Sequence, residues 1–151
     1  EQKLAGDGKV STTVDETTTT RTFGLNKSDD SQNAADLDYA IQLNSDGTAA
    51  VYENGVLRTE SSVDYAEGDV FSVQHIGTQI TYLKNGEVFY TSTVPAPSTD
   101  LLVDTAFESQ FGTLKILSLK NQVWRWVIIS LPLGLKTPRP RRQVRLVLPL
   151  T

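Results

Sequence analysis

Apolar and polar residues alternate in short runs along most of this chain. Tyr39, Ile41 and Leu43 occupy every second position, and the same spacing recurs within 70–75 and 79–83. Successive side chains of a β-strand point to opposite faces of its sheet, so this alternation predicts half-buried strands. No segment keeps the 3.6-residue spacing that is typical of an amphipathic helix.

Three pairs of turn residues separate these runs: Asp46-Gly47, Asn54-Gly55 and Asn85-Gly86. Asn, Asp and Gly tolerate positive φ, which tight hairpin turns require. We therefore expect strands at 9–14, 17–25, 38–43, 48–53, 56–60, 70–75, 79–83, 87–92, 101–107 and 113–119. About ten short strands with a turn signal about every 8–12 residues indicate an all-β protein, an antiparallel sandwich or barrel. For the Thr-rich 8–25, a flexible glycosylated stalk is the alternative.

Two stretches resemble a known family. They are 65–73, Tyr-Ala-Glu-Gly-Asp-Val-Phe-Ser-Val, and 77–86, Gly-Thr-Gln-Ile-Thr-Tyr-Leu-Lys-Asn-Gly. Together they resemble the centre of concanavalin A-like jelly-roll domains, including SPRY-type and laminin G-type modules, where a Gly-Asp turn precedes a core strand and a strand ending in Lys-Asn-Gly follows. The segment 101–107 fits the next strand of such domains.

This resemblance covers about residues 8–119 and implies an antiparallel β-sandwich of jelly-roll type. It leaves function open, because the superfamily includes lectins, glycanases, adhesion modules and protein-binding modules. The first strands are short for a complete jelly roll, and the segment after Lys120 matches nothing in the family.

Length and composition narrow the possibilities further. A chain of 151 residues is long enough to bury a core without a metal or disulfide. The absence of cysteine excludes disulfides, thiolate zinc sites and a cysteine nucleophile. The chain starts Glu-Gln rather than Met and has a Thr-rich, acidic composition. With the resemblance, these features lead us to expect an extracellular or cell-surface protein.

Charge divides the chain into two parts. Residues 1–120 hold 8 Lys and Arg against all 18 Asp and Glu, a formal charge of −10, whereas 121–151 hold six basic residues and no acidic one. We therefore expect an acidic jelly-roll-like β-sandwich at 1–120 and a basic C-terminal tail with Trp and Pro at 121–151. An acidic body argues against nucleic acid as its partner. The longest apolar stretch, 123–135, is too short and interrupted to cross a membrane as a helix.

Catalytic chemistry has little support in the sequence. A jelly-roll glycanase needs two carboxylates about 5–5.5 Å apart for retention. The nearest string, Glu67-Gly68-Asp69, lies at a predicted turn and lacks the further Glu of related glucanases. His75 is the only histidine and more plausibly has a structural role. We expect no enzymatic activity and no cofactor, with calcium as the one possibility.

The calcium candidates are Asp29, Asp30, Asp36 and Asp38, the densest group of acidic residues. Calcium prefers several carboxylate and carbonyl oxygens, although EF-hand spacing is absent here. The alternative is a solvated polar loop.

Carbohydrate binding has candidates among the aromatic and amide residues of the predicted hairpins. These are Tyr52, Asn54, Tyr82, Asn85 and Tyr90. Strand tyrosines also pack on sheet faces, and Asn-Gly pairs already explain turns, so each residue has a structural alternative.

The tail carries both tryptophans, Trp124 and Trp126, in a β-prone apolar run, and a further predicted strand at 143–148. Three interpretations stay open: the tail adds strands to its own sandwich, it completes the sheet of a neighbouring subunit, or it is a foreign or poorly ordered end. The residues that would serve assembly are Trp124, Trp126, Val144, Leu146 and Leu148.

The sequence thus favours a non-catalytic extracellular binding module, most plausibly lectin-like and carbohydrate-binding. The alternative is a structural subunit of a surface fibre or coat, assembled by strand exchange or tail docking. A jelly-roll glycanase is the third interpretation. The expected partners are a glycan or other copies of the same chain.

Overall fold

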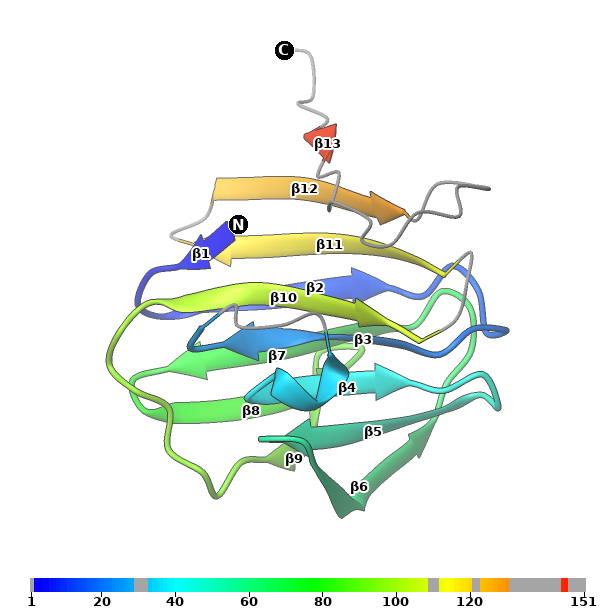
Figure 1. Ribbon diagram of the computed structural model, residues 1–151, viewed down its shortest axis with the longest axis horizontal. Coiled ribbons are helices and arrows are strands. Elements are labelled where there is room, and N and C mark those ends of the chain that lie inside the picture. Colours follow the sequence, from blue (N-terminus) through cyan, green and yellow to red (C-terminus); the bar gives the residue numbers. More distant parts are fainter. Residues whose placement is uncertain (1, 29–32, 109–111, 121–122, 131–144, 147–151) are drawn as a thin grey trace.

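A computed structural model of this chain consists of two antiparallel β-sheets packed face to face (Figure 1). The predicted all-β antiparallel sandwich is therefore confirmed. The structure describes the backbone of residues 2–28, 33–108, 112–120, 123–130 and 145–146, and the side chains of 3–28, 33–108 and 112–116.

Sheet A has six strands among the described residues. In spatial order they are β1 (Gln2–Leu4), β10 (Leu101–Phe107), β3 (Arg21–Asn26), β4 (Tyr39–Leu43), β5 (Thr48–Glu53) and β6 (Val56–Asp64). Every pair of neighbours is antiparallel. The β4–β5 and β5–β6 hairpins turn at the predicted Asp-Gly and Asn-Gly pairs.

Sheet B has seven strands among the described residues. In spatial order they are β13 (Arg145–Leu146), β12 (Val123–Ser130), β11 (Thr113–Lys120), β2 (Gly8–Thr13), β7 (Val70–Ile76), β8 (Gln79–Lys84) and β9 (Glu87–Thr91). Strands far apart in sequence, such as β2 and β11, are direct neighbours. Long-range pairing of this kind joins the first and last parts of the acidic body.

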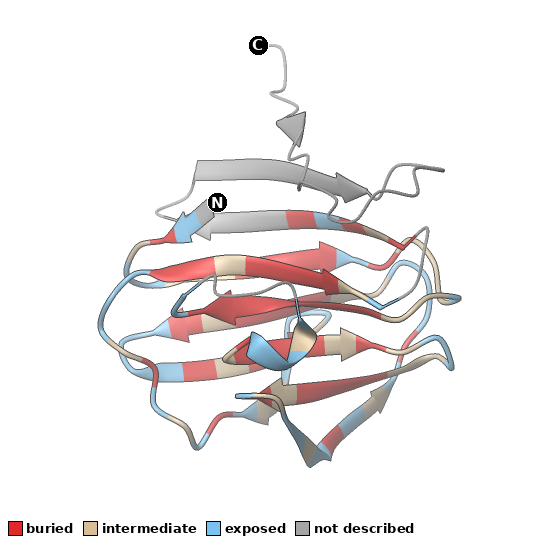
Figure 2. Cartoon of the chain, in the orientation of Figure 1, coloured by how far each residue is buried: buried red, intermediate tan, exposed pale blue. Residues whose placement is uncertain are grey.

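The core lies between the sheets and follows from the alternation in sequence. Phe23 and Ile41 from sheet A, and Phe71, Val73 and Tyr82 from sheet B, are all fully buried. Figure 2 shows buried residues along the strands of both layers. Each such side chain contributes about 1.5–3 kcal/mol when removed from water, which makes this core the main source of stability.

A short 3-10 helix, η1 (Ala34–Asp36), lies on the outer face of sheet A (Figure 1). Asn33 caps it by accepting a hydrogen bond from the Ala35 backbone N–H at 3.2 Å. The adjoining Leu37 is buried against Ala40 and Ala106, so the outer face of sheet A carries a small second core. Strand β3, between β10 and β4 in the middle of sheet A, is buried along its whole length.

The second predicted strand, at 17–25, begins later in the structure than the sequence pattern indicated. Residues 17–20 form a turn rather than the beginning of β3, because the Glu16 carboxylate accepts hydrogen bonds from the backbone N–H groups of Thr18 (2.6 Å) and Thr19 (3.0 Å). A side chain that satisfies backbone donors locally removes the need for a sheet partner. The structure also adds β1, which the sequence pattern did not indicate, and extends β6 to Asp64.

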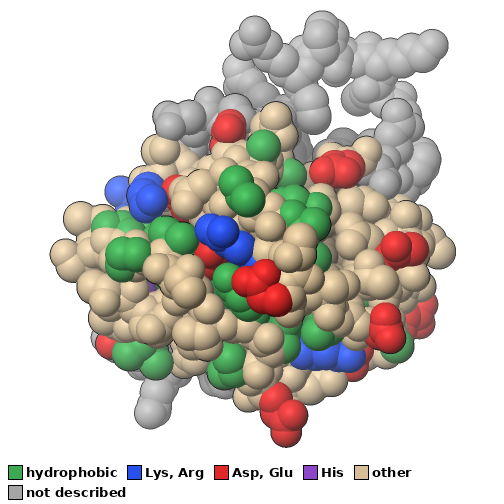
Figure 3. Space-filling model, turned by 90° about the horizontal axis from the view of Figure 1, so that it is seen from below, with side chains coloured by type: hydrophobic (Ala, Val, Ile, Leu, Met, Phe, Trp, Pro, Cys, Tyr) green, Lys and Arg blue, Asp and Glu red, His purple; other side chains and the backbone are tan. Residues whose placement is uncertain are grey.

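The side of the sandwich formed by the edge strands β6 and β9 is irregular. Register shifts interrupt β5–β6 pairing between Ala49 and Val51, and β8–β9 pairing between Tyr82 and Leu83. Figure 3 looks onto this side and shows apolar side chains interspersed with acidic and basic ones. Bulges and charges on edge strands prevent pairing with other chains, so these edges are protected.

The described part of the tail joins sheet B. Strand β12 pairs antiparallel with β11 along its whole length, from Thr113 opposite Ser130 to Lys120 opposite Val123. Strand β13 pairs with β12 through Leu146 opposite Val127. The predicted assembly residues Val144 and Leu148 lie outside the described residues. In the described part of the chain, no helix has the length and apolar character needed to span a membrane.

Candidate functional site

The predicted carbohydrate residues do not form one surface. Tyr82 is fully buried in the core, and its ring centroid lies 5.7 Å from that of the half-buried Tyr90. Tyr52 belongs to sheet A and packs against the small core beneath η1. The structure thus brings Tyr82 and Tyr90 together and places Tyr52 elsewhere.

Asn54 and Asn85 occupy the turns that their Asn-Gly pairs predicted. Both have positive φ, 49° and 52°. The Asn85 side chain accepts a hydrogen bond from the Val70 backbone N–H at 2.8 Å and donates one to the Asp69 carboxylate at 2.8 Å. Its amide therefore holds the β6–β7 turn next to the β8–β9 hairpin.

Glu53 and Tyr82 link the two sheets through a buried polar contact. The Tyr82 hydroxyl donates to Glu53 Oε1 at 2.9 Å, and Arg58 Nε donates to Glu53 Oε2 at 2.9 Å. Burial, followed by the nearby Glu53 charge, raises the pKa of Tyr82 far above its ordinary value. The phenol therefore stays protonated and acts as a donor to a carboxylate that is fully buried.

The proposed calcium group is divided by the structure. Both Asp38 oxygens contact Lys27: Oδ1 lies 3.0 Å from the Lys27 ammonium, and Oδ2 accepts from the Lys27 backbone N–H at 2.8 Å. This hydrogen bond raises the pKa of Lys27. Asp36 is exposed on η1, and Asp29 and Asp30 lie outside the described residues. Over the ranges described, no three His, Cys, Asp or Glu side chains are grouped to hold a metal ion.

His75 has the surroundings of a structural residue. It is 1% exposed on the inner face of β7, and its Nδ1 lies 3.2 Å from the Gly6 carbonyl oxygen. Among the described residues its Nε2 has no hydrogen-bond partner. A ring enclosed in this way has no access to a substrate.

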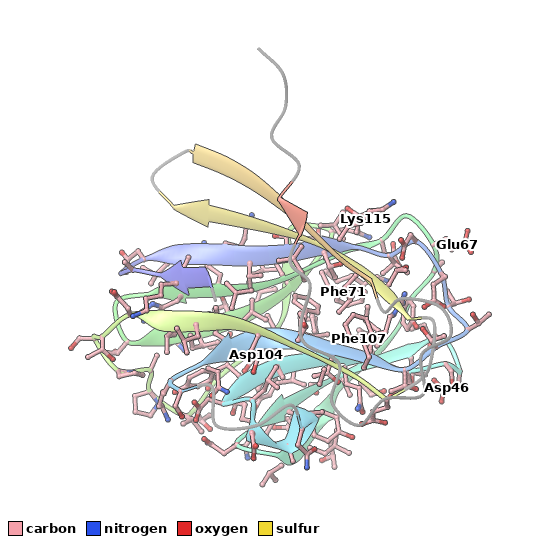
Figure 4. The ribbon with its side chains drawn as sticks, turned by 45° about the horizontal axis from the view of Figure 1, so that its top comes forward. Asp46, Glu67, Phe71, Asp104, Phe107 and Lys115 are labelled. Carbon is pink, nitrogen blue, oxygen red and sulfur yellow. The ribbon has the colours of Figure 1, made fainter. Side chains whose placement is uncertain are left out.

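One end of the sandwich carries a buried arginine. The Arg21 guanidinium is fully buried and donates to the Glu16 carboxylate (2.7 Å), the Glu16 carbonyl (2.6 Å) and the Thr113 carbonyl (3.2 Å). Figure 4 shows Lys115, Glu67 and Asp46 at the same end. The Arg21 contacts join the turn before β3 to the start of β11, so they stabilise loops rather than leave a free cation.

The outer face of sheet B has a different character from that of sheet A. Core residues such as Val10 and Val73 point inward, so their neighbours Lys9, Ser11 and Gln74 lie on the outer face. Among the described residues no helix covers this face, whereas η1 lies on sheet A.

Two cross-strand rows make up this surface, which we call the polar face. The lysine row consists of Lys9, Gln74, Thr81 and Thr91. The serine row consists of Ser11, Ser72, Leu83 and Val88. Residues directly opposite each other in antiparallel strands lie on the same face, so each row runs across β2, β7, β8 and β9, a span of about 14 Å.

Hydroxyl and amide groups dominate these rows. The Ser11 and Ser72 hydroxyls lie 2.8 Å apart, and the Thr81 hydroxyl donates to Gln74 Oε1 at 3.4 Å. Neither row contains Asp or Glu, although residues 1–120 have a formal charge of −10. Ser11 and Ser72 are buried and bond to each other, so the groups that a ligand can reach are those of the lysine row, which is half-buried to exposed.

Sequence reasoning missed the polar face. Alternation separates the two faces of a single strand, but the rows depend on which strands are neighbours. Strand order of this kind, with β2 between β11 and β7, is set by long-range pairing.

No protein-family model matches the chain, and no curated protein matches it either.

Proposed function

We propose that this protein is a non-catalytic, extracellular carbohydrate-binding module of the concanavalin A-like jelly-roll type, and that it binds its glycan on the polar face. The single observation that carries this proposal is the lysine row, which presents solvent-accessible hydroxyl and amide groups and no carboxylate on an otherwise acidic body. Sugars are neutral, hydroxyl-rich ligands that exchange hydrogen bonds with such groups. The two-sheet architecture and the resemblance of 65–86 to jelly-roll domains support the fold type.

A glycanase fits the polar face less well. Hydrolysis needs a general acid and a second carboxylate on either side of the scissile bond. The lysine and serine rows supply neither. Binding without turnover is therefore the function that this surface supports.

The experiment is calorimetric titration with hexasaccharides derived from cellulose, xylan, mannan and chitin. Gln74→Leu removes the central amide of the lysine row and is expected to weaken binding about tenfold, equivalent to about 1.4 kcal/mol. Gln42→Leu is the matched control, because Gln42 lies on the outer face of sheet A, where it donates to Glu108 at 3.1 Å. Equal losses in the two variants, or no binding of any hexasaccharide to the wild type, would contradict the proposal.

A second function, a structural subunit assembled by strand exchange, is favoured by one observation. Among the described residues, the outer edge of the eight-residue strand β12 pairs only with the two residues of β13. A long apolar edge with so short a partner can accept a strand from another copy. Sedimentation velocity over a range of protein concentrations tests this alternative, which predicts growth in mass as concentration rises.

A further inference from the structure

The three Asx-Gly turns of the fold differ in how firmly their side chains are held. Asp46-Gly47, Asn54-Gly55 and Asn85-Gly86 each close a hairpin, and each Gly has a positive φ. Asn is a chemically labile residue, and a following Gly favours its deamidation because no Cβ shields the Gly backbone nitrogen. The folded structure decides which of these pairs can react.

Deamidation is an intramolecular substitution. The Gly backbone nitrogen attacks the Asn Cγ, a C–N bond forms, and the side-chain nitrogen leaves as ammonia with the proton of the Gly nitrogen. Water then opens the cyclic imide at either carbonyl and gives Asp or isoaspartate. Ring closure needs a rotation about ψ that brings Cγ beside the Gly nitrogen, so a closed two-residue turn must open first. The free energy of that local opening therefore controls the rate.

The Asn85 turn is held by three hydrogen bonds. The Asn85 backbone N–H donates to the Val70 carbonyl at 2.7 Å, and the Asn85 side-chain oxygen accepts from the Val70 N–H at 2.8 Å. The side-chain nitrogen donates to Asp69 Oδ1 at 2.8 Å. Opening this turn breaks both side-chain hydrogen bonds, so the structure protects Asn85.

Asp46 is protected in another way. The same ring closes from Asp through the protonated acid, with water as the leaving group. Asp46 Oδ1 accepts hydrogen bonds from the Thr48 hydroxyl at 2.6 Å and the Thr48 backbone N–H at 3.0 Å. These bonds lower the pKa of Asp46, so its carboxyl stays ionised at neutral pH and is held away from the Gly47 nitrogen.

Asn54 lacks such protection. Its side chain is exposed and makes no hydrogen bond with the described residues. Beyond strand pairing, the turn is held by the hydrogen bond from the Asn54 N–H to the Asp38 carbonyl at 3.0 Å. Gly55 also packs against η1, since a Cβ there would lie 2.8 Å from the Ala35 carbonyl oxygen. The turn leads into the edge strand β6, whose first residue, Val56, is 56% exposed.

We propose that Asn54 is a site of spontaneous deamidation in the folded protein, and that side-chain hydrogen bonds protect Asn85 and Asp46. Asn54 and Asn85 have nearly the same φ, 49° and 52°, and both precede Gly, so they form a matched pair. Isoaspartate at position 54 adds a methylene group to the backbone of a two-residue turn. This product is expected to weaken the packing of Gly55 against Ala35 and to loosen the start of β6.

The experiment uses the unmodified full chain, incubated at neutral pH and physiological temperature. Peptide mapping by mass spectrometry measures conversion at each Asn, and an isoaspartyl methyltransferase detects isoaspartate. Asn54 is expected to convert at least about tenfold faster than Asn85, because the Asn85 turn must lose two further hydrogen bonds to open. In guanidinium chloride, where both turns are unfolded, the two sites are expected to convert at similar rates.

A variant tests the protection directly. Asp69→Ala removes the acceptor of the Asn85 amide and is expected to raise the rate at Asn85 about fivefold or more, with no change at Asn54. Glu67→Ala is the matched control, because Glu67 is exposed in the same β6–β7 turn. This control is expected to leave both rates unchanged, and circular dichroism confirms the fold of each variant.

Three outcomes would overturn the proposal. One is conversion at Asn85 that equals or exceeds conversion at Asn54 in the folded protein. Another is an Asn54 that stays intact while the unfolded chain converts, which would show that packing against Ala35 keeps its turn closed. The third is an unchanged rate at Asn85 in the folded Asp69→Ala variant, which would remove the protective role assigned to its hydrogen bonds.

Discussion

The Tyr82 hydroxyl on sheet B donates a hydrogen bond of 2.9 Å to the Glu53 carboxylate on sheet A. Both side chains are fully buried, so this contact crosses the core at a place where water cannot replace either partner. Arg58 satisfies the second carboxylate oxygen from the edge strand β6. The three residues connect β5, β6 and β8 near the irregular edge of the sandwich.

Tyr82→Phe is expected to destabilise the protein by about 1–3 kcal/mol, because it leaves a buried carboxylate oxygen without its donor. Urea denaturation at neutral pH measures the change in the free energy of unfolding. Tyr90→Phe is the control: Tyr90 is only half-buried, and we expect a loss of less than about 0.5 kcal/mol. A Tyr82→Phe variant as stable as the wild type would show that the hydrogen bond between the sheets contributes nothing.

Acid is expected to weaken the turn that Glu16 organises. Burial raises the pKa of Glu16, but hydrogen bonds from Thr19 and Thr18 and the charge of Arg21 outweigh it and lower the pKa below 4.5. A carboxyl whose pKa is lower in the folded state contributes stability above its unfolded pKa. That contribution is present above about pH 4.5 and disappears as the pH falls through the lower folded value.

Unfolding free energies of the wild type and Glu16→Gln, measured from pH 7 to pH 3, test this dependence. The difference between the two proteins is expected to be largest at neutral pH and to shrink below about pH 4.5. Glu67→Gln is a suitable control, because Glu67 is exposed at the same end of the sandwich (Figure 4). A difference that stays constant over the whole range would contradict the assigned role of Glu16.

Most strands of this fold could be predicted from the sequence, because alternation and Asx-Gly turns are local signals. Residues 17–20 were assigned to a strand because Thr favours β-structure, whereas the Glu16 side chain binds the backbone there and forms a turn. Strand β1 has only three residues, too few to show alternation, and it forms because Leu4 is buried in the core opposite Leu101.

The candidate site was harder to predict. Tyr82 is a core residue despite its polar group, because Glu53 on the other sheet accepts its hydroxyl, and no local pattern indicates such a partner. The rows of the polar face depend on β2 lying between β11, about 100 residues away in sequence, and β7, about 60 residues away. Alternation within one strand therefore could not show which residues of other strands share its outer surface.

Gly24 is expected to tolerate no side chain. A Cβ at this position would lie 2.0 Å from the Tyr39 carbonyl oxygen and 2.8 Å from the Ala40 Cα, both backbone atoms of the neighbouring strand. Gly24→Ala must therefore move β3 away from β4, at a cost of about 3 kcal/mol or more. Thermal denaturation monitored by circular dichroism measures the effect.

The matched substitution is Gly6→Ala. No atom lies within 4 Å of a Cβ placed there, and its φ of +69° costs Ala only about 1–2 kcal/mol. A smaller drop in Tm for Gly24→Ala than for Gly6→Ala would contradict this prediction. It would show that β3 and β4 accommodate the added methyl group without losing stability.

Removal of the tail distinguishes a strand of the sandwich from a link between subunits. A chain ending at Lys120 loses β12, and the whole length of β11 becomes an unpaired edge. Light scattering and urea denaturation of the full and shortened chains are expected to show a monomeric full chain, and a shortened chain that is less stable and associates through this edge. If the full chain is the larger species and the shortened one is a stable monomer, the tail joins subunits, and the structural alternative replaces the carbohydrate-binding one.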